Sequence, residues 1–301
     1  MAAGFENSTI IIWKDNTLTT NTKLKGHEKK VKSFALIAND ILASGSCDST
    51  IKIWNLTTAS NIKNVTGHKG CVNSLFFLDF LNKPFLLSIS DDSTIKVWNS
   101  SFDLIETYYS ESVTALAYDP IYKYVASGSK DNKINLYSVS FTLSNKNDAV
   151  HKEKIRAIYV LKNGLIATGS TDATIKIWRQ NGSKTLELIK TLKEHKYAIY
   201  SLAVLSNGSL ISGSADGNIK VWNQINETFF ECVTNLTHPD QVTSLAVLSG
   251  ILNGSIYVRN ETSFQMIQIL NNHTNIVWSM IALDNQSFAS ASEDGDRKSV
   301  V

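Results

Sequence analysis

A short phrase, Ser-Gly-Ser-x-Asp-x-Thr-Ile-Lys-Ile-Trp, recurs along this chain and limits the folds that the chain can adopt. It first runs from Ser44 to Trp54 and returns in varied form at 88–98, 127–137, 168–178 and 212–222. The aspartates in these copies are residues 48, 92, 131, 172 and 216, so successive copies start 39 to 44 residues apart. A period of this length indicates stacked supersecondary units.

Each unit predicts four short β-strands. In the first unit, apolar and β-branched residues fill 31–36 and 41–46, a turn follows at 47–49, and polar and apolar residues alternate over 50–54. A weaker fourth strand is expected at 60–65. A sheet this small cannot bury both of its apolar faces alone. Stacking such sheets around an axis solves the problem, which predicts an all-β fold, the β-propeller.

The residues around the phrase resemble the WD-repeat (WD40) family. Gly26-His27 and Gly67-His68 stand before the first strands, and the turn aspartates and the tryptophans follow at the family's positions. The family's usual Asp after the Trp is replaced here, by Asn55, Asn99, Arg179 and Asn223. The resemblance covers essentially the whole chain and implies a protein that presents a surface rather than one that performs a reaction.

The repeats predict one domain, residues 1–301, folded as a seven-bladed β-propeller of four-stranded antiparallel blades. The last blade would be shared between the chain ends: 7–13 and 18–24 supply its outer strands, and 273–294 supply its inner strands. Trp13 would then complete the blade of His273 and Asp294. Residues 296–301 depart from the pattern, as a tail or as the cut end of a longer chain.

Two repeats depart from the phrase. The sixth, 241–270, is about six residues short, with Asn253 in place of Asp and Arg259 in place of Trp. We expect its second strand to be missing or merged into a tight hairpin. In the third, 109–112 replaces Gly-His and Tyr137 replaces Trp.

All six histidines stand just before a predicted inner strand. The resemblance implies that five of them join a structural hydrogen-bond network with a turn Asp and a Trp of their blade. The implied networks are His27/Asp48/Trp54, His68/Asp92/Trp98, His151/Asp172/Trp178, His195/Asp216/Trp222 and His273/Asp294/Trp13. Since the fold accounts for every histidine, and phosphate-binding, nucleophile-elbow and metal-binding motifs are missing from the sequence, we expect no enzyme, no catalytic residue, no metal and no cofactor.

The composition and the first residues indicate where in the cell the protein is located. The net charge is only +2, and the first residues carry no basic stretch followed by an apolar one. We therefore expect an intracellular protein without a transmembrane segment, in the cytoplasm rather than the nucleus. Cys47, Cys71 and Cys232 lack metal-ligand spacing, which favours three reduced thiols over a disulfide or a metal site.

In this family, side chains beside the start of the first strand and before the turn Asp lie on the top face of the propeller. They form a rim around the mouth of the central channel, where partners bind. The corresponding partner-binding candidates are Lys30, Lys32, Asn73, Asp91, Lys130, Lys154, Arg156, Tyr200 and Trp278. We expect the lysines and Arg156 to make one part of the rim basic, and Tyr200 and Trp278 to make another part aromatic. The competing interpretation is that Trp278 packs into the channel wall and the lysines are only solvated.

Two functions compete. The first is a non-catalytic scaffold, a monomeric propeller within a complex, that binds protein or acidic peptide partners on this face. The second is binding of nucleic acid or an anionic surface through the basic part of the rim. The modest net charge disfavours nucleic acid, as do the carboxylates of Asp91 and Glu293 on the same rim. A third class, a hydrolase, would need a reaction that depends on a residue outside the networks.

Overall fold

A computed structural model describes residues 9–14, 20–80, 83–109, 113–119, 124–138, 143–147, 150–181, 185–226, 228–245, 248–251, 255–260, 263–283 and 287–292. Across these residues there are 28 β-strands and no helix, so the fold is all-β. No helix long and apolar enough to cross a membrane occurs among them. The chain divides into two compact units, described separately below: unit 1 is 1–110, 252–260 and 265–301, and unit 2 is 111–251 and 261–264.

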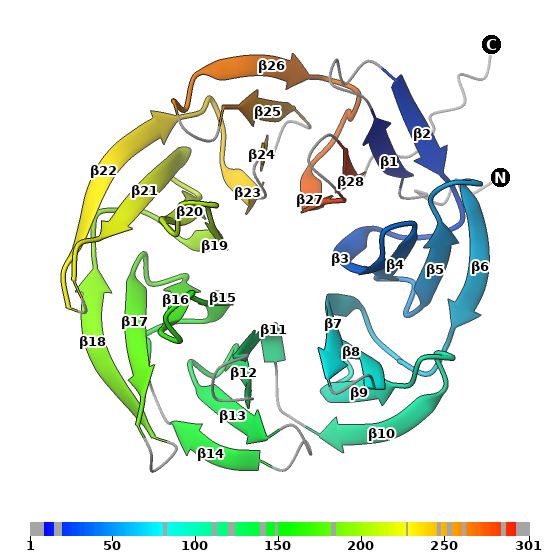
Figure 1. The fold of residues 1–301 in the computed structure, drawn as a ribbon, viewed down its shortest axis with the longest axis horizontal. Helices are drawn as coiled ribbons and strands as arrows, with labels where there is room; N and C mark the ends of the chain where they lie inside the picture. Colours follow the sequence, from blue (N-terminus) through cyan, green and yellow to red (C-terminus); the bar gives the residue numbers. More distant parts are fainter. Residues whose placement is uncertain are drawn as a thin grey trace, which may run out of the picture. The chain divides into compact units, whose positions relative to one another are not determined.

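Unit 1 contains three four-stranded antiparallel sheets and one hairpin (Figure 1). The strands of the first two sheets are β1 (Thr9–Lys14), β2 (Thr20–Leu24), β27 (Val277–Ala282) and β28 (Phe288–Ser292), then β3 (Val31–Ala38), β4 (Ile41–Ser46), β5 (Ile51–Asn55) and β6 (Ser60–Val65). The third sheet contains β7 (Val72–Phe80), β8 (Lys83–Ser90), β9 (Thr94–Trp98) and β10 (Leu104–Tyr109), and the hairpin is β25 (Ile256–Arg259) with β26 (Met266–Leu270). The sheet orders are β2-β1-β28-β27, β3-β4-β5-β6 and β10-β9-β8-β7.

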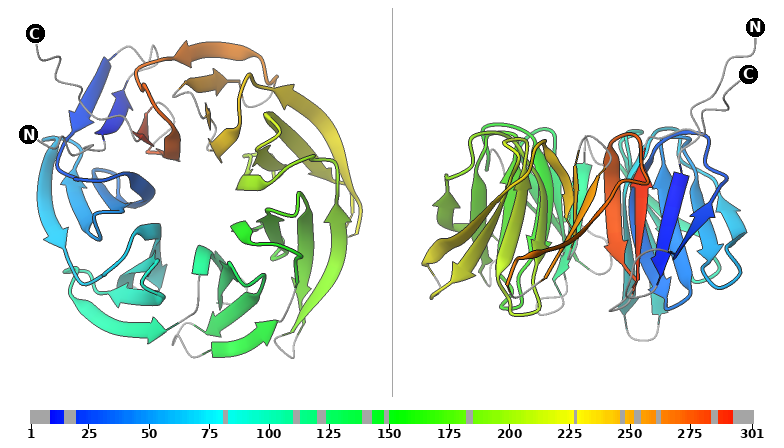
Figure 2. Two further views of the ribbon diagram at one scale, coloured as in Figure 1. Left: turned by 180° about the vertical axis from the view of Figure 1, so that it is seen from behind. Right: turned by 90° about the horizontal axis from the view of Figure 1, so that it is seen from above.

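Unit 2 repeats this construction. Its sheets contain β11 (Val113–Asp119), β12 (Tyr124–Ser129), β13 (Ile134–Ser138) and β14 (Leu143–Asn147), then β15 (Ile155–Val160), β16 (Ile166–Ser170), β17 (Ile175–Gln180) and β18 (Leu186–Leu192), then β19 (Ile199–Val204), β20 (Leu210–Ser214), β21 (Asn218–Gln224) and β22 (Phe230–Thr237). Its hairpin is β23 (Val242–Leu245) with β24 (Leu248–Ile251). In both units the first strands of successive sheets contact one another, as β3 contacts β7 and β15 contacts β19. Figure 2 shows the same ribbon from behind and from above. Sheets that repeat and pack in this way are the blades of a β-propeller.

The glycine of the recurring phrase makes the close packing of neighbouring sheets possible. A Cβ added to Gly45 would lie 2.6 Å from Cγ1 of Val72, the first residue of β7. Gly128, Gly169 and Gly213 meet Ile155, Ile199 and Val242 in the same way, at 2.5–2.6 Å. A β-branched side chain from each next sheet therefore rests on a bare Cα of the sheet before it, and any larger residue would force the sheets apart.

Apolar residues fill the space between these sheets. In unit 1 one cluster brings Ile10 and Ala289 together with Leu42 and Trp54, all at most 1 % exposed. In unit 2 a cluster around Ile177 and Leu210 includes Trp222. The sheets thus bury their apolar faces against each other, as the sequence pattern predicted.

The two ends of the chain meet in one sheet of unit 1. Strand β1 pairs antiparallel with β28, with Ile10 opposite Ala291 and Trp13 opposite Phe288. Strand β2 pairs with the other edge of β1. Residues that lie far apart in the sequence therefore share one ladder of hydrogen bonds.

The shortened sixth repeat keeps its second strand. Val242 pairs with Ile251 and Leu245 with Ser249, which makes β23 and β24 a short hairpin. The strand is therefore present in the tight-hairpin form rather than missing.

Two of the three cysteines differ from expectation. Cys47 and Cys71 form a disulfide, and Cys232 is free. The prediction of reduced thiols is wrong for this pair for a physical reason. Cys47 follows Gly45 by two residues and Cys71 directly precedes Val72, so the contact between Gly45 and Val72 brings the two cysteines together. The sequence separation of 24 residues alone does not indicate this proximity.

Candidate functional site

Four of the five copies of the phrase build a buried chain of polar contacts. In the first copy, His27 Nε2 lies 2.7 Å from Ser44 Oγ, which also accepts the indole N–H of Trp54 at 2.7 Å. His27 Nδ1 lies 2.7 Å from Asp48 Oδ2. Ser46, the second serine, donates its hydroxyl to the Lys29 carbonyl. The two serines thus have separate structural roles, one in the network and one in holding the turn.

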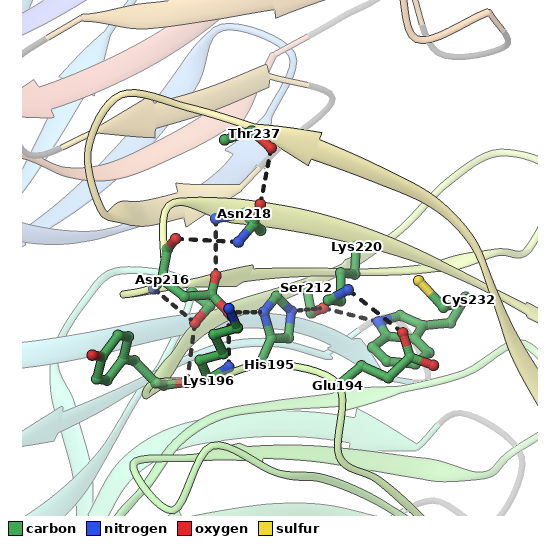
Figure 3. Close-up of polar contacts among 12 residues, drawn as sticks. Glu194, His195, Lys196, Ser212, Asp216, Asn218, Lys220, Cys232 and Thr237 are labelled. Carbon is green, nitrogen blue, oxygen red and sulfur yellow. Dashed lines mark hydrogen bonds and ion pairs between the residues drawn. The ribbon is translucent and has the colours of Figure 1, made fainter.

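The same arrangement recurs in three further blades, with His–Asp distances of 2.8–2.9 Å. It joins His68 to Asp92 and Ser88, His151 to Asp172 and Thr168, and His195 to Asp216 and Ser212, with Trp98, Trp178 and Trp222 donating to the three hydroxyls. Figure 3 shows the network of His195, with its ring between Asp216 and Ser212. The structure thus brings together the predicted members of these four networks.

The directions of the hydrogen bonds follow from the donors available. The indole N–H of Trp222 can only donate, so Ser212 Oγ accepts it and can turn its own proton toward His195 Nε2. His195 Nδ1 then carries the proton that faces Asp216. Burial lowers the pKa of His195 and of His68, which favours this uncharged ring. The imidazoles of His68 and His195 are therefore neutral, and both ring nitrogens of each are hydrogen-bonded.

The turn aspartates stay ionised in this setting. Burial alone would raise the pKa of Asp92, but hydrogen bonds from Thr94, the Lys69 amide and His68 lower it to about 2. Burial also raises the pKa of Asp48 and Asp172, but the hydrogen bonds from His27 and His151, together with those from a threonine hydroxyl and a backbone amide, hold both pKa values well below the ordinary value. A carboxylate that accepts hydrogen bonds from three backbone or hydroxyl donors and an imidazole, as in Asp92, holds a turn in place and is poorly suited to accept a substrate proton.

The blade shared by the chain ends has the same core. Trp13 Nε1 donates to Ser290 Oγ at 2.9 Å, and His273 Nε2 lies 2.8 Å from the same oxygen. Trp13 also stacks on Phe288 with ring centroids 5.6 Å apart. Asp294, the expected third member, lies outside the described residues, as do Asn7 and Glu293.

The third repeat lacks part of the network. Ser127 occupies the position of Ser44 and is fully buried, but among the residues that the structure describes its Oγ has no hydrogen-bond partner. Tyr137 replaces the tryptophan and is buried, so no indole N–H reaches this hydroxyl. The residues that replace Gly-His, 110–112, lie outside the described part of the chain.

Most partner-binding candidates share a backbone feature that the sequence does not reveal, a β-bulge near the start of the first strand. In β3, Val31 pairs with Ser46 and Ser33 pairs with Gly45, so Lys32, which lies between them, is the extra residue of a β-bulge. The same shift occurs in the other six first strands and sets apart Asn73, Thr114, Arg156, Tyr200, Thr243 and Trp278. A bulge frees a residue from the alternation of the strand and redirects its side chain.

In unit 1 two bulged residues, Lys32 and Trp278, form a cationic and aromatic cluster with Lys30. Lys32 Nζ lies 3.1 Å from the ring centroid of Trp278, and Lys30 Nζ lies 5.0 Å from it. All three side chains are half-buried. We call Lys30, Lys32 and Trp278 the Trp278 cluster. In the next sheet, Asn73 Nδ2 donates to Asp91 Oδ1 at 2.9 Å, so this amide is held by the exposed carboxylate.

Unit 2 carries a second pair of the same kind. The guanidinium carbon of Arg156 lies 5.5 Å from the ring centroid of Tyr200, and Arg156 Nε also contacts Thr171 Oγ1 at 3.4 Å. Lys130 and Lys154 are exposed. In each unit cations therefore lie on aromatic rings, and the expected separation into a basic part and an aromatic part is wrong. Neighbouring bulges bring side chains from adjacent sheets into contact.

No group of three or more His, Cys, Asp or Glu side chains that could hold a metal ion occurs among the residues that the structure describes.

Comparison with known proteins agrees with this geometry. The family model of the WD domain, G-beta repeat (WD40), matches residues 18–55, 59–99, 103–138, 148–179 and 186–223, which together exceed half of the chain. The chain is 34 % identical over 193 residues to zinc finger CCCH domain-containing protein 17 of Oryza sativa subsp. japonica, covering 61 % of this chain and 44 % of that protein.

Two further relatives are similar over comparable lengths. Nuclear distribution protein nudF of Aspergillus niger is 28 % identical over 220 residues, which cover 64 % of this chain and 49 % of that protein. A guanine nucleotide-binding protein subunit beta of Oryza sativa subsp. indica is 24 % identical over 180 residues, 54 % of this chain and 47 % of that protein. The chain thus spans about half of the length of the relatives it matches. The chain belongs to the WD40 repeat family, whose propeller proteins typically mediate protein–protein interactions.

Proposed function

We propose that this protein is a non-catalytic scaffold that binds protein or peptide partners through the bulged ends of its first strands. The observation that carries the proposal is the bulge itself, repeated at the same position in successive sheets. A bulge at one position can be incidental, but a repeated one presents a row of variable side chains on a fixed frame. Such an arrangement suits recognition of an extended surface.

The Trp278 cluster supports a partner with acidic character. Trp and cationic side chains are the residues that most often dominate binding energy at interfaces. Lys32 and Lys30 bring two ammonium groups to one half-buried ring, and desolvation by a partner would strengthen their attraction for a carboxylate. Arg156 on Tyr200 offers a similar pairing in unit 2.

We propose further that the sheets form a seven-bladed propeller with the last blade shared between the chain ends. The pairing of β1 with β28 and the common use of Ser290 by Trp13 and His273 support the shared blade. The two hairpins, β23–β24 and β25–β26, supply four strands for the remaining blade. Small-angle scattering should then fit a compact disc, and scattering of an open arc would contradict closure.

Non-enzymatic function rests on the histidines and on the family. His68 and His195 are buried, uncharged and bonded at both ring nitrogens, so they lack the freedom that a general base needs. The WD40 family consists generally of non-catalytic scaffolds. The expected cytoplasmic location stays a prediction.

The experiment compares affinity capture by the parent protein and by a Lys32→Ala/Arg156→Ala/Trp278→Ala variant, with cross-linking to locate each captured partner. A Lys25→Ala/Lys193→Ala variant, which changes exposed lysines outside the set, is the matched control. Loss of partners from the first variant alone would support the bulged surface. Unchanged partners, or cross-links elsewhere, would refute it. Capture of RNA with a steep salt dependence would favour the alternative, nucleic-acid binding.

A further inference from the structure

A pocket lies at the opposite end of the strands in unit 2, away from the bulges. It is formed by the turn between β15 and β16, the turn between β19 and β20, and the end of β21, and its volume is about 640 Å³. This is within the range of ligand-binding pockets. We propose that it binds an anionic oxygen group, a carboxylate or a phosphate, carried by a partner peptide.

Hydrogen bonds between two neighbouring sheets hold the walls of this pocket in place. Lys162 Nζ donates to the Ser206 carbonyl at 2.6 Å, and Asn163 Nδ2 donates to Gln224 Oε1 at 2.9 Å. These contacts join segments 44 and 61 residues apart. Ser209, which is buried, donates its hydroxyl to Asn223 Oδ1. The walls of the pocket are therefore held in place before a ligand arrives.

Backbone N–H groups fix the orientation of the asparagine side chains that line the pocket. Asn207 Oδ1 accepts the Ser209 amide at 2.9 Å, and Asn163 Oδ1 accepts the Leu165 amide at 3.2 Å. Asn226 Oδ1 accepts the amides of Thr228 and Phe229. A backbone N–H requires an oxygen, so these side chains cannot be reversed without losing a bond.

This orientation leaves the pocket with donors. Asn163 donates its side-chain N–H to the side-chain oxygen of Gln224. The NH2 group of Gln224 therefore remains available to a ligand. The NH2 groups of Asn207 and Asn226 and the ammonium of Lys162 add to it. The lining residues include no aspartate or glutamate. Several N–H donors with one positive charge and no competing carboxylate match the acceptors of an anionic oxygen group.

The rest of the lining indicates a peptide. Ile225 is 59 % exposed at the pocket, so an aliphatic side chain next to the anion could cover it. Nothing lies within 4 Å of a Cβ placed on Gly208, which leaves room for a main chain to approach. An acidic residue flanked by aliphatic ones satisfies both features.

The test uses three acetylated and amidated pentapeptides, Gly-Val-Glu-Val-Gly and the same sequence with Gln or phosphoserine at the centre. Nuclear magnetic resonance of the full chain follows the side-chain NH2 signals of Asn207, Gln224 and Asn226 during each titration. We expect the Glu or the phosphoserine peptide to shift these signals and the Gln peptide to leave them unchanged. Whichever anion shifts them identifies the source of the charge.

Two variants locate the effect. Lys162→Met should weaken binding about tenfold, the size of one charge-assisted hydrogen bond. Asn207→Asp keeps an oxygen for the Ser209 amide and replaces the NH2 group with negative charge, so it should abolish binding while the fold is retained. Lys193→Met, an exposed lysine outside the pocket, is the control and should bind as the parent does. A Gln peptide that shifts the signals as strongly as the anionic peptides do, no shifts by either anionic peptide at millimolar concentration, or unchanged binding by both variants would overturn the proposal.

Discussion

Substitution of Trp13 tests the meeting of the chain ends in one sheet. Trp13 is 1 % exposed, donates its indole N–H to Ser290, and stacks on Phe288. Trp13→Ala removes all of this, and a buried Trp→Ala change costs about 3–5 kcal/mol. Trp13→Phe retains most of the ring contact. It removes the hydrogen bond, which contributes about 1 kcal/mol, and leaves a small cavity.

The assay combines urea unfolding with hydrogen exchange of the parent, Trp13→Phe and a matched control, Trp54→Phe. Trp54 is equally buried and donates to Ser44 in the same way, but its sheet is continuous in sequence. Both variants should lose similar free energy of unfolding. Trp13→Phe should speed exchange at 20–24 and at 288–292, whereas Trp54→Phe should speed it within 31–65.

The location of faster exchange decides the result. If Trp13→Phe leaves exchange at 288–292 at the parent rate, β1 does not stabilise β28, and the shared sheet is refuted. A double change, Trp13→Phe with Ser290→Ala, adds a further check. Because both changes remove the same hydrogen bond, their effects should fall short of additive by about 1 kcal/mol.

Three further predictions concern the networks and the sheet packing. Tyr137→Trp should stabilise the protein by about 1 kcal/mol in urea unfolding, because it offers an indole N–H to the unpaired Ser127 Oγ; a loss of stability would show that the site cannot accommodate the ring. Stability should fall as the pH drops below 6.5, because burial lowers the pKa of His68 and His195 and the unfolded chain then binds more protons than the folded one. It should fall again from about pH 4 toward 2, because the pKa of Asp92 is lowered in the folded protein. A thermal midpoint that stays constant over both pH ranges would contradict this prediction. Gly45→Ala should cost about 1–3 kcal/mol through its clash with Val72, and Val72→Ala in the same chain should relieve part of that loss; additive losses in the double variant would refute the contact.

The recurring phrase predicted much of the fold because each of its residues has a fixed structural task. Ser44 joins the network, Gly45 admits the next sheet, Ser46 holds the turn and Trp54 closes the core. Period-two alternation then places the strands. The Cys47–Cys71 bond escaped prediction because it depends on packing between repeats, which residue spacing within the sequence does not express.

The candidate surface could be predicted only in part, for a similar reason. Family positions indicated Lys32, Arg156 and Trp278, but neither glycine nor proline marks the bulges that set these residues apart. The contacts of Lys30 and Lys32 with Trp278 join β3 to β27, which lie at opposite ends of the chain. Charge and aromatic content along the sequence suggested two regions, whereas adjacent sheets bring these side chains into one cluster.

The two ends of the strands therefore differ in what constrains their residues. At the end with the turn aspartates, the networks hold the backbone, and the bulged positions carry different side chains from sheet to sheet. At the other end, the turns contain no part of the phrase, and Asn163, Asn207 and Asn226 shape them through their own backbone contacts. An amide that caps its own turn must present its nitrogen outward. Local turn chemistry in adjacent repeats is thus sufficient to create a donor-rich pocket without any change to the repeating core.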